Sequence, residues 1–586
     1  MSNSAIHPYP ILDDRLDGQS SVGFGVYQGA QSINQMTYTA QTTSASTVSI
    51  SCLIPSLQTV IDRAILVKTQ TTLLVTGTPL ANQYLINFGT NSASTGGAGA
   101  LNCGNTCLNS FPFSRGVSQT TCQINNATLS MNYESELDII LKQMNQAELA
   151  KYADLCPVGY DIYNNCATAQ LQVNQISALR SQYANTLQSS ADMAIPARGA
   201  FVIDQVGFAI NGTNYANTIG DGNTQVTVSV QFTTTEPYFL SPFCYGDSLD
   251  SSLAGLYGVS ALNFTFNMLA DAGRMIRCGQ RNANNNTPYT ATIQAINSCQ
   301  IIMNLLTPKP SQLLPLTCAL PYVDLPVYKT QIPAGVTRVV SSVIAPNTVP
   351  DKIYIAIRKP NRSTYDADSY FPINNLSITW GTQSGILAPC NKEQLYTFSK
   401  RGGCSLSYEA WSGFSGGYAG QNSVGQANAV NMVGGYVVLN MGEVIPLADS
   451  WVSSGSIGTF SIMVTASFDN NTDGTVPATE LLIILQNSGV ILSVSGSSSS
   501  YVGLLNRETV LNMAEQEPVN HTQNKRMLGG GWLDSLKSVS TSALKNLVPL
   551  LAPIAKEQLA NSDNKFAKLA SMGIGMAGYG RKPRHH

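Results

Sequence analysis

Hydrophobic and polar residues alternate along several short stretches of this chain. The clearest stretch is Thr224–Phe232, which runs on to a proline at Pro237. Similar alternation occurs at Thr47–Ser51, at Ile353–Ile357 and at Thr459–Asp469. Successive side chains of a strand point to opposite faces, so this pattern predicts β-strands with one buried face.

Uninterrupted apolar runs predict further strands, and apolar residues at helical spacing predict two helices. The runs Leu481–Leu485 and Val490–Leu492 flank Asn487–Gly489, which predicts two buried strands joined by a turn. Apolar residues recur every three or four positions within Glu134–Leu155 and Gln170–Leu187. These two segments are predicted helices in an otherwise β-rich chain.

The many short strands and turns favour β-sandwiches, and a proline-rich segment divides them into two blocks. Both predicted helices fall in one long excursion from the first block, which we interpret as an insertion; a separate small helical domain is the alternative. The expected layout is an N-terminal arm at 1–20, a first β domain at 21–307 with the insertion at about 90–200, a proline-rich connection at 308–326, a second β domain at 327–505, a flexible linker at 506–531 and a tail at 532–586.

The chain has few charged residues, and this excludes several classes of function. Only 11% of the 586 residues are charged, whereas 43% are hydrophobic. The surface must therefore consist largely of uncharged polar residues, which suits a protein that contacts many copies of itself. The net charge of −2 argues against nucleic-acid binding through bulk electrostatics. No apolar run reaches the 18 residues of a membrane helix, and the start of the chain resembles neither a secretory signal nor a myristoylation site.

The positions of the histidines and cysteines argue against most kinds of catalytic site and metal site. The four histidines are His7, His521, His585 and His586, so the body of the chain has none for a catalytic triad or a zinc site. The twelve cysteines include no CxxC pair, which favours free, buried thiols made in a reducing compartment. We therefore expect no catalytic residues, no metal and no cofactor; an enzyme that uses only carboxylates stays open as an alternative.

The tail after residue 531 differs in character from the rest. It carries an apolar helical stripe, and from residue 532 onward eight Lys or Arg outnumber three Asp or Glu. Such a basic amphipathic helix fits the surface of a membrane, whereas the alternative is a helix docked beneath the protein's own β domains. The membrane-facing candidates are Trp532, Leu536, Val539, Leu547, Leu550 and Ile554, with Lys537 and Lys545 for anionic headgroups.

The β-rich body resembles the major capsid proteins of double jelly-roll viruses, a lineage that includes adenovirus hexon and the capsid proteins of polinton-like viruses, adintoviruses and adomaviruses. The resemblance covers roughly residues 20–505 and rests on length, low charge and the segments Glu236–Phe243 and Val349–Ile355. It implies an all-β fold with two jelly-roll sandwiches side by side, a mixed helical insertion and an amphipathic helical C-terminal tail.

The tail is similar to the adenovirus internal protein that disrupts endosomal membranes, which also has a Trp-bearing amphipathic helix after a Gly-Gly pair. Adenovirus-type cysteine proteases favour glycines before the cut, because small residues let an extended strand enter a narrow groove. Met432–Gly435 also matches this pattern, but it lies beside a predicted strand, where folding would block cleavage. The resemblance implies two processing sites, Met527-Leu528-Gly529-Gly530 before Gly531 and Met576-Ala577-Gly578-Tyr579 before Gly580.

The expected function is structural. The resemblance implies that three copies form a pseudo-hexagonal capsomer of an icosahedral virion, assembled in the host cytoplasm or nucleus. The expected partners are other copies of the chain, other capsid proteins such as a penton, a host membrane through the tail, a viral cysteine protease and, only weakly, nucleic acid.

Two alternatives remain from the sequence. One is a single jelly-roll coat protein with a protruding β domain, and the other is a non-enzymatic surface adhesin or binding protein.

Overall fold

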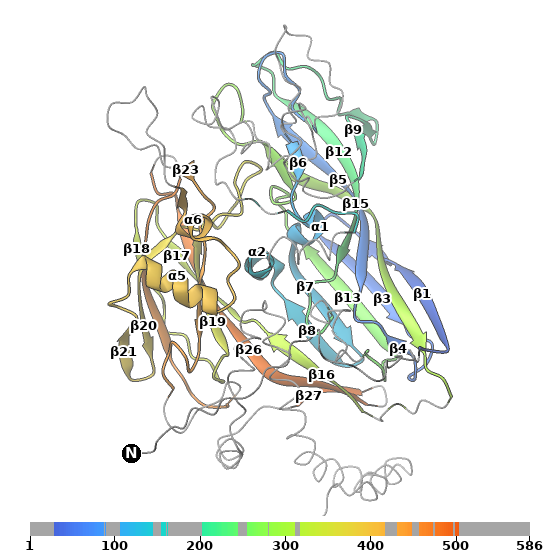
Figure 1. Cartoon of the computed structure of the whole chain (residues 1–586). Coiled ribbons are helices and arrows are strands. Elements are labelled where there is room, and N and C mark those ends of the chain that lie inside the picture. The colour runs from blue at the N-terminus through green and yellow to red at the C-terminus, as the bar shows by residue number, and fades with distance from the viewer. Residues whose placement is uncertain are drawn as a thin grey trace, which may run out of the picture.

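The chain folds mainly into β-strands that form two sandwiches standing side by side (Figure 1). This architecture comes from a computed structural model of the chain. It describes residues 29–86, 88, 106–144, 154–159, 161, 202–243, 255–278, 281–310, 314, 317–415, 430–447, 456–472, 475–495 and 498–502.

The first sandwich has two antiparallel sheets. One sheet has the order β1-β15-β5-β12-β9, with β4 beside β15, and the other has the order β2-β3-β13-β7-β8. The bounds are β1 Ser32–Thr39, β2 Thr42–Thr43, β3 Thr47–Leu53, β4 Val60–Ile61, β5 Leu66–Gly77, β7 Val117–Ile124, β8 Ala127–Met131, β9 Val202–Val206, β12 Val226–Pro237, β13 Ala261–Met268 and β15 Thr290–Thr307. The small pairs β6–β14 and β10–β11 accompany it, with bounds β6 Thr106–Leu108, β10 Ala209–Ile210, β11 Thr213–Asn214 and β14 Ile276–Cys278.

The second sandwich is built in the same way. Its sheets have the orders β16-β26-β19-β24, with β17 and β27 also on β26, and β18-β25-β20-β21. The bounds are β16 Thr317–Asp324, β17 Val327–Ile332, β18 Arg338–Val340, β19 Lys352–Arg358, β20 Ile373–Trp380, β21 Gln383–Ile386, β24 Val437–Asn440, β25 Ile462–Phe468, β26 Thr479–Ser495 and β27 Ser498–Val502. A further pair joins β22 Phe414–Ser415 to β23 Val430–Asn431.

Both sandwiches share one topology. Counted in chain order, the eight main strands are β1, β3, β5, β7, β8, β12, β13 and β15 in the first sandwich, and β17, β18, β19, β20, β21, β24, β25 and β26 in the second. In each case one sheet has the order first, eighth, third, sixth, and the other has the order second, seventh, fourth, fifth. This eight-stranded, two-sheet arrangement is the jelly roll. The predicted all-β fold with two jelly rolls side by side is confirmed.

The alternating stretches of the sequence became strands with one buried face. On β25, every second residue from Ile462 to Phe468 is buried, whereas the residues between them are half-buried. On β3, Val48 and Ile50 are buried, whereas the residues on either side of them are half-buried. Alternation therefore located these strands because each covers a core on one side only.

The region from 479 to 495 differs from its prediction. In place of two strands joined by a turn at Asn487–Gly489, it forms the single 17-residue strand β26. Its first part pairs with β17 and β19, and its second part pairs with β16 and β27. Polar residues in mid-strand mark the place where β26 leaves one set of partners for another, so they do not reverse the chain.

The predicted insertion at about 90–200 is woven into the first jelly roll over its described part. Strands β7 and β8 from this segment belong to the main sheet beside β13. It also supplies helices α1 (Pro112–Arg115) and α2 (Tyr133–Gln143). The predicted helix at Glu134–Leu155 ends at Gln143, because Met144 has extended backbone angles, and the one at Gln170–Leu187 lies outside the described residues.

The proline-rich connection contains strand β16, which crosses beneath the first jelly roll together with β26 and β27 (Figure 1). The turn between β7 and β8 contacts strand β27 through two side chains. Asn126 Oδ1 accepts a hydrogen bond from the Ser499 backbone at 2.6 Å, and Asn125 Nδ2 donates to Ser499 Oγ at 3.3 Å. The last described strand therefore belongs spatially to the first jelly roll.

Candidate functional site

Helix α2 lies between the two jelly rolls (Figure 1). It begins at the N-cap Asn132, whose side chain accepts from Ser135 N at 3.2 Å, while Glu136 Oε1 accepts from Asn132 N at 3.1 Å. This reciprocal pair satisfies backbone groups at the start of the helix. Almost every residue of α2 is buried, charged ones included, because a protein surface covers the helix on both sides.

The partner of α2 is the outer face of a sheet in the second jelly roll. Ile139 belongs to the hydrophobic core of the second jelly roll, although its helix follows a strand of the first. Glu136 and Gln143 line a small cavity together with Tyr354 on β19 and Ile484 on β26. Strand β19 is consequently buried on both faces, and its sequence alternation did not reveal this.

A network of ion pairs with Asp138 at its centre joins the first jelly roll to the second. The Asp138 carboxylate is fully buried and contacts Arg115 Nη1 at 2.5 Å and Arg274 Nη2 at 3.0 Å. It also forms an ion pair with Arg362, and Arg358 Nη1 lies 3.9 Å away. Asp138, Arg115 and Arg274 belong to the first jelly roll, whereas Arg358 and Arg362 belong to the second.

Further acidic groups extend the network. Asp368 pairs with Arg362 at 2.6 Å and also with Arg115. Glu480 on β26 pairs with Arg358 Nε at 2.8 Å. The Lys142 ammonium donates to the Asp368 carbonyl oxygen, and its nitrogen lies 4.3 Å from the centre of the Tyr370 ring.

The network sets the protonation of its members. Burial alone would raise the pKa of Asp138, but Arg362, Arg274, Arg115 and Arg358 hold it well below its usual value. Burial lowers the pKa of Lys142 to about 8. A carboxylate with a depressed pKa contributes stability above its unfolded pKa of about 3.9 and loses it only as the pH falls through the folded value. The Asp138 contacts therefore persist in mildly acidic solution.

The pKa of Glu136 is shifted in the opposite direction to that of Asp138. Burial raises the pKa of its carboxyl well above the usual range, and the charge of Asp324 raises it further. Its Oε1 accepts the Asn132 hydrogen bond, whereas its Oε2 is buried with no hydrogen-bond partner. The charged form is thus disfavoured at this contact.

The two segments that carried the resemblance have structural roles. The Glu236 carboxylate accepts hydrogen bonds from Phe113 N at 2.7 Å and Ser114 N at 2.9 Å, which anchors α1 to the end of β12. Tyr238 and Phe239 follow it into the first core. The segment Val349–Ile355 leads into β19, the strand covered by α2.

The residues proposed from the sequence for processing and membrane contact lie outside the described part of the chain. This holds for Met527–Gly531, Met576–Gly580 and the apolar and basic candidates from Trp532 to Ile554. The third matching segment, Met432–Gly435, is described: Met432 and Val433 are buried beside β24, out of reach of a protease.

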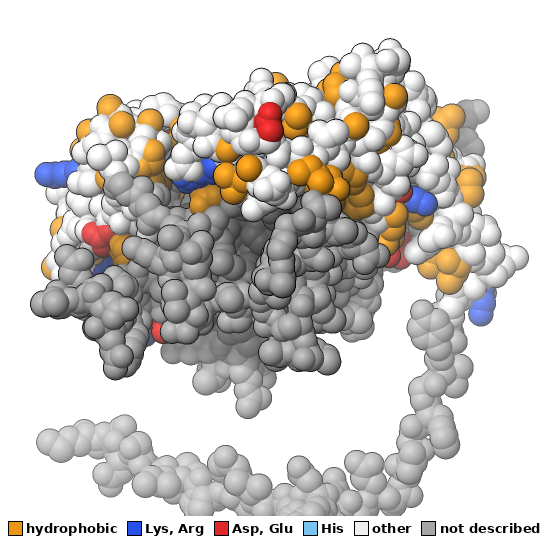
Figure 2. Space-filling view, turned by 90° about the horizontal axis from the view of Figure 1, so that it is seen from above, with side chains coloured by type: hydrophobic (Ala, Val, Ile, Leu, Met, Phe, Trp, Pro, Cys, Tyr) orange, Lys and Arg blue, Asp and Glu red, His pale blue; other side chains and the backbone are white. Residues whose placement is uncertain are grey.

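Over the described ranges, no three His, Cys, Asp or Glu side chains gather to hold a metal ion. Within the same ranges, no helix has the length and hydrophobicity needed to cross a membrane. Several cysteines are buried free thiols, namely Cys52, Cys122, Cys156, Cys299, Cys318 and Cys404. Seen from above, the surface is mostly uncharged, with scattered hydrophobic side chains and few charges (Figure 2).

Sequence reasoning missed the ionic network. Its members are far apart along the chain, so no motif unites them. A signal was nevertheless present: Asp138 stands between Leu137 and Ile139, and Arg358 directly follows the alternating segment Ile353–Ile357. In a chain with 11% charged residues, charges at core-like positions indicate a buried ion pair.

Comparison with known proteins agrees with the topology. Residues 6–306 match the family described as Sputnik virophage major capsid protein 1st domain, which is half of the chain, and residues 323–489 match the family described as Major capsid protein V20 C-terminal domain. The chain belongs to the Sputnik virophage major capsid protein family. It is accordingly a structural protein of the virion capsid that assembles with copies of itself.

Individual relatives cover nearly the whole chain. The putative capsid protein V20 of the Sputnik virophage is 22% identical over 92% of this chain and 87% of its own length. A chain in the cryo-EM structure of the Sputnik virophage has a TM-score of 0.70 and 20% identity over 90% of this chain and 99% of its own length. The crystal structure of the mavirus major capsid protein has a TM-score of 0.65 and 13% identity, and covers 88% of this chain and 100% of its own length.

Replacing Asp138 tests the ionic network. Asp138→Asn removes the buried anion that four arginines share and leaves Arg274 without its ion-pair partner, which should lower the free energy of unfolding by about 3–5 kcal/mol. Urea unfolding measures this change. The control is Arg401→Gln, which removes an exposed pair at 3.8 Å from Glu443 and should cost no more than about 1 kcal/mol. Equal effects of the two changes would contradict the role of the network.

Replacing Glu136 tests its protonation. A raised folded pKa means that the wild-type protein loses stability as the pH rises above the unfolded value of about 4.3, by up to about 1.4 kcal/mol per pH unit. Glu136→Gln removes this loss, so its melting temperature relative to wild type should increase between pH 5 and pH 8. The exposed Glu409→Gln variant controls for the change in net charge. A difference from wild type that is the same at both pH values would contradict the prediction.

Proposed function

We propose that three copies of this capsid protein form a pseudo-hexagonal capsomer, the building block of an icosahedral shell. The observation that carries this proposal is the shared strand order of the two jelly rolls. Because each chain supplies two blocks of the same topology, three chains supply six similar blocks. Six such blocks can occupy the corners of a hexagon while the assembly keeps the threefold symmetry of identical chains.

The same observation separates this proposal from its alternatives. A single jelly-roll coat protein with a protruding domain would have an unrelated second half, whereas both halves here have the same eight-stranded order. The low charge of the chain supports close contact between copies. Vertices of such a shell need a different contact geometry, which would be met by a separate penton protein.

We further propose that residues 506–586 face the inside of the shell, with 506–531 as a linker and 532–586 as a releasable tail. Strand β27 ends at Val502 at the lower end of the molecule, so the tail departs from that end (Figure 1). A viral cysteine protease would cut after Gly530 and after Tyr579, where the sequence pairs an apolar residue with small glycines. The burial of Met432 and Val433 supports the choice of Gly530 over the third matching segment.

The freed tail would act on a membrane of the host. Trp532, Leu536, Leu547 and Leu550 would insert into the lipid interface, and Lys537 and Lys545 would contact anionic headgroups. The adenovirus-like character of the tail supports this action. The basic end of the chain has only Arg581, Lys582 and Arg584, so nucleic acid is at most a weak partner.

Native mass spectrometry of the purified full chain tests the capsomer. The expected mass is three times the 62.5 kDa of one chain, and negative-stain images should show six-sided particles. A protein that stays monomeric at every concentration and ionic strength tested would overturn the proposal.

Co-expression with the protease of the same virus tests the processing. The intact mass should correspond to a chain that ends at Gly530, and Gly529→Leu should prevent this cut because the bulky side chain cannot enter the groove. Gly573→Leu, in the same tail but outside both sites, should leave cleavage at Gly530 unchanged. Cleavage of Gly529→Leu at the wild-type rate would contradict the assigned site.

A further inference from the structure

A lysine outside the network around Asp138 is buried in the second jelly roll. Lys352 is only 5% exposed, and its Nζ donates to the Gly402 carbonyl oxygen at 2.7 Å. Gly402 is the C-cap of helix α5 (Lys392–Arg401) and lies against Val438 of β24. Val438 and Asn440 are two positions apart on β24 and therefore share one face of the strand. The hydrogen bond to Gly402 thus places the Lys352 amine over the face of β24 that carries Asn440.

Asn440 lies directly across the sheet from this lysine. Lys352 is the first residue of β19, and its antiparallel partner is Asn440, the last residue of β24. Side chains of a directly opposed pair share one face, with their Cβ atoms about 4.5–5.5 Å apart. A lysine side chain is long enough to cross this gap. Rotation about its torsions can therefore carry the amine from the Gly402 carbonyl to Cγ, the amide carbon of Asn440.

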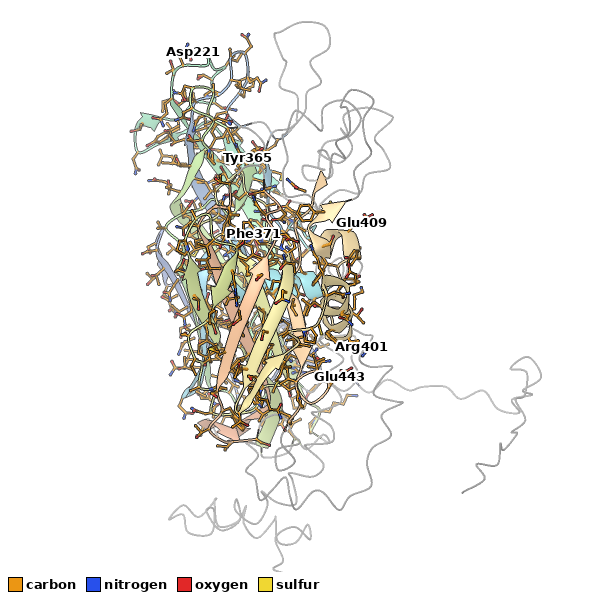
Figure 3. All side chains as sticks on the ribbon, turned by 90° about the vertical axis from the view of Figure 1, so that its left-hand side faces the viewer. Asp221, Tyr365, Phe371, Arg401, Glu409 and Glu443 are labelled. Carbon is orange, nitrogen blue, oxygen red and sulfur yellow. The ribbon has the colours of Figure 1, made fainter. Side chains whose placement is uncertain are left out.

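A carboxylate already contacts the same amide group. Asn440 Nδ2 donates to Glu443 Oε2 at 2.9 Å, whereas Asn440 Oδ1 is buried and has no hydrogen-bond partner among the described residues. Figure 3 shows Glu443 beside Arg401, whose Nη1 lies 3.8 Å from Glu443 Oε1. The amide nitrogen is therefore in contact with a base, and the amide oxygen is open to an approaching amine.

The surroundings of Lys352 favour its uncharged form. Burial lowers the pKa of Lys352 to about 8, against the charges of Asp351 and Glu443, which raise it. About a tenth of the side chain is then an uncharged amine near pH 7, compared with less than about a thousandth for an ordinary lysine. An uncharged amine is a nucleophile, and the exclusion of water from the site protects a newly formed amide from hydrolysis.

We propose that Lys352 and Asn440 join in an intramolecular isopeptide bond, with Glu443 as the carrier of the proton. The Lys352 amine attacks Cγ of Asn440, gives a proton to Glu443, and Glu443 passes this proton to the departing nitrogen. The bond between Nζ and Cγ forms, the bond between Cγ and Nδ2 breaks, and one ammonia molecule leaves. The reaction changes no oxidation state. Its driving advantage is the fixed proximity of the two side chains in one sheet register.

The bond would link an edge strand covalently to its sheet. Strand β24 is at the edge of the order β16-β26-β19-β24, so its backbone pairs with β19 alone within that sheet. A covalent link between positions 352 and 440 also restricts the unfolded chain, as a disulfide does. The second jelly roll would therefore resist unfolding by heat and denaturant more strongly with the bond than without it. The proposal concerns one chain and does not depend on the capsomer.

Intact mass spectrometry of the purified, denatured full chain tests the bond. The wild-type mass should be lower than the mass of its sequence by one ammonia molecule, and a tryptic digest should contain a branched peptide that joins Lys352 to Asn440. Asn440→Asp should instead lose one water molecule, because hydroxyl replaces the amide nitrogen as the leaving group. Lys352→Met keeps an unbranched side chain without an amine, so its mass should equal that of its sequence.

Replacing Glu443 tests the proton transfer in a chain that should keep its fold, since the Glu443 side chain is 43% exposed. The mass is followed at intervals after cell-free synthesis of the chain. Glu443→Gln should form the bond at least about a hundredfold more slowly than wild type, because a glutamine cannot carry the proton. The control is Glu409→Gln, on the short helix α6 (Tyr408–Ser412) near the other end of α5 (Figure 3), which should form the bond at the wild-type rate.

Three results would count against the proposal. A folded wild-type chain with the full mass of its sequence would overturn the bond, because Lys352 would then only cap α5. Loss of ammonia without the branched peptide would also overturn it, since an exposed Asn-Gly pair such as Asn211-Gly212 can lose ammonia by closing on its own backbone. Bond formation at the wild-type rate in Glu443→Gln would overturn the role assigned to Glu443.

Discussion

The buried ion pairs around Asp138 are the interaction on which the arrangement of this protein depends. Arginines from both jelly rolls converge on Asp138, on an α2 helix that lies between them. Taking several charges out of water is expensive, and the cost is offset only when each charge meets its partners in one geometry. We infer that the network favours one relative position of the two sandwiches, because the charges are compensated only in that geometry.

That fixed position gives the chain its role as a building block. Two jelly rolls of the same strand order, held at one angle, present a repeating surface to the next copy. Charged side chains gather inside this joint, whereas the described part of the face seen from above carries few charges (Figure 2). Such a chain suits assembly with copies of itself, in agreement with its membership of a major capsid protein family.

The sequence predicted those parts of the fold in which a strand covers a single core. Strands β3 and β25 alternate because one face meets the core and the other is only half-buried. The sequence of β19 did not predict that both of its faces are buried. The helix that covers the second face, α2, comes from a segment some 220 residues earlier in the chain. Two further features depend on tertiary contacts, which a local sequence pattern cannot predict. They are the change of strand partners along β26 and the contact between Asp138 and Arg358. The proposed tail sites lie outside the described residues and stay predictions.

A cryo-EM map of the assembled capsomer would test the central claim most directly, since it shows the contact within each chain and the association of chains at once. The account predicts six jelly-roll lobes from three chains, with α2 on the sheet face of the second jelly roll within each chain. A map in which the chains form no six-lobed trimer, or in which α2 lies away from the second jelly roll, would contradict it.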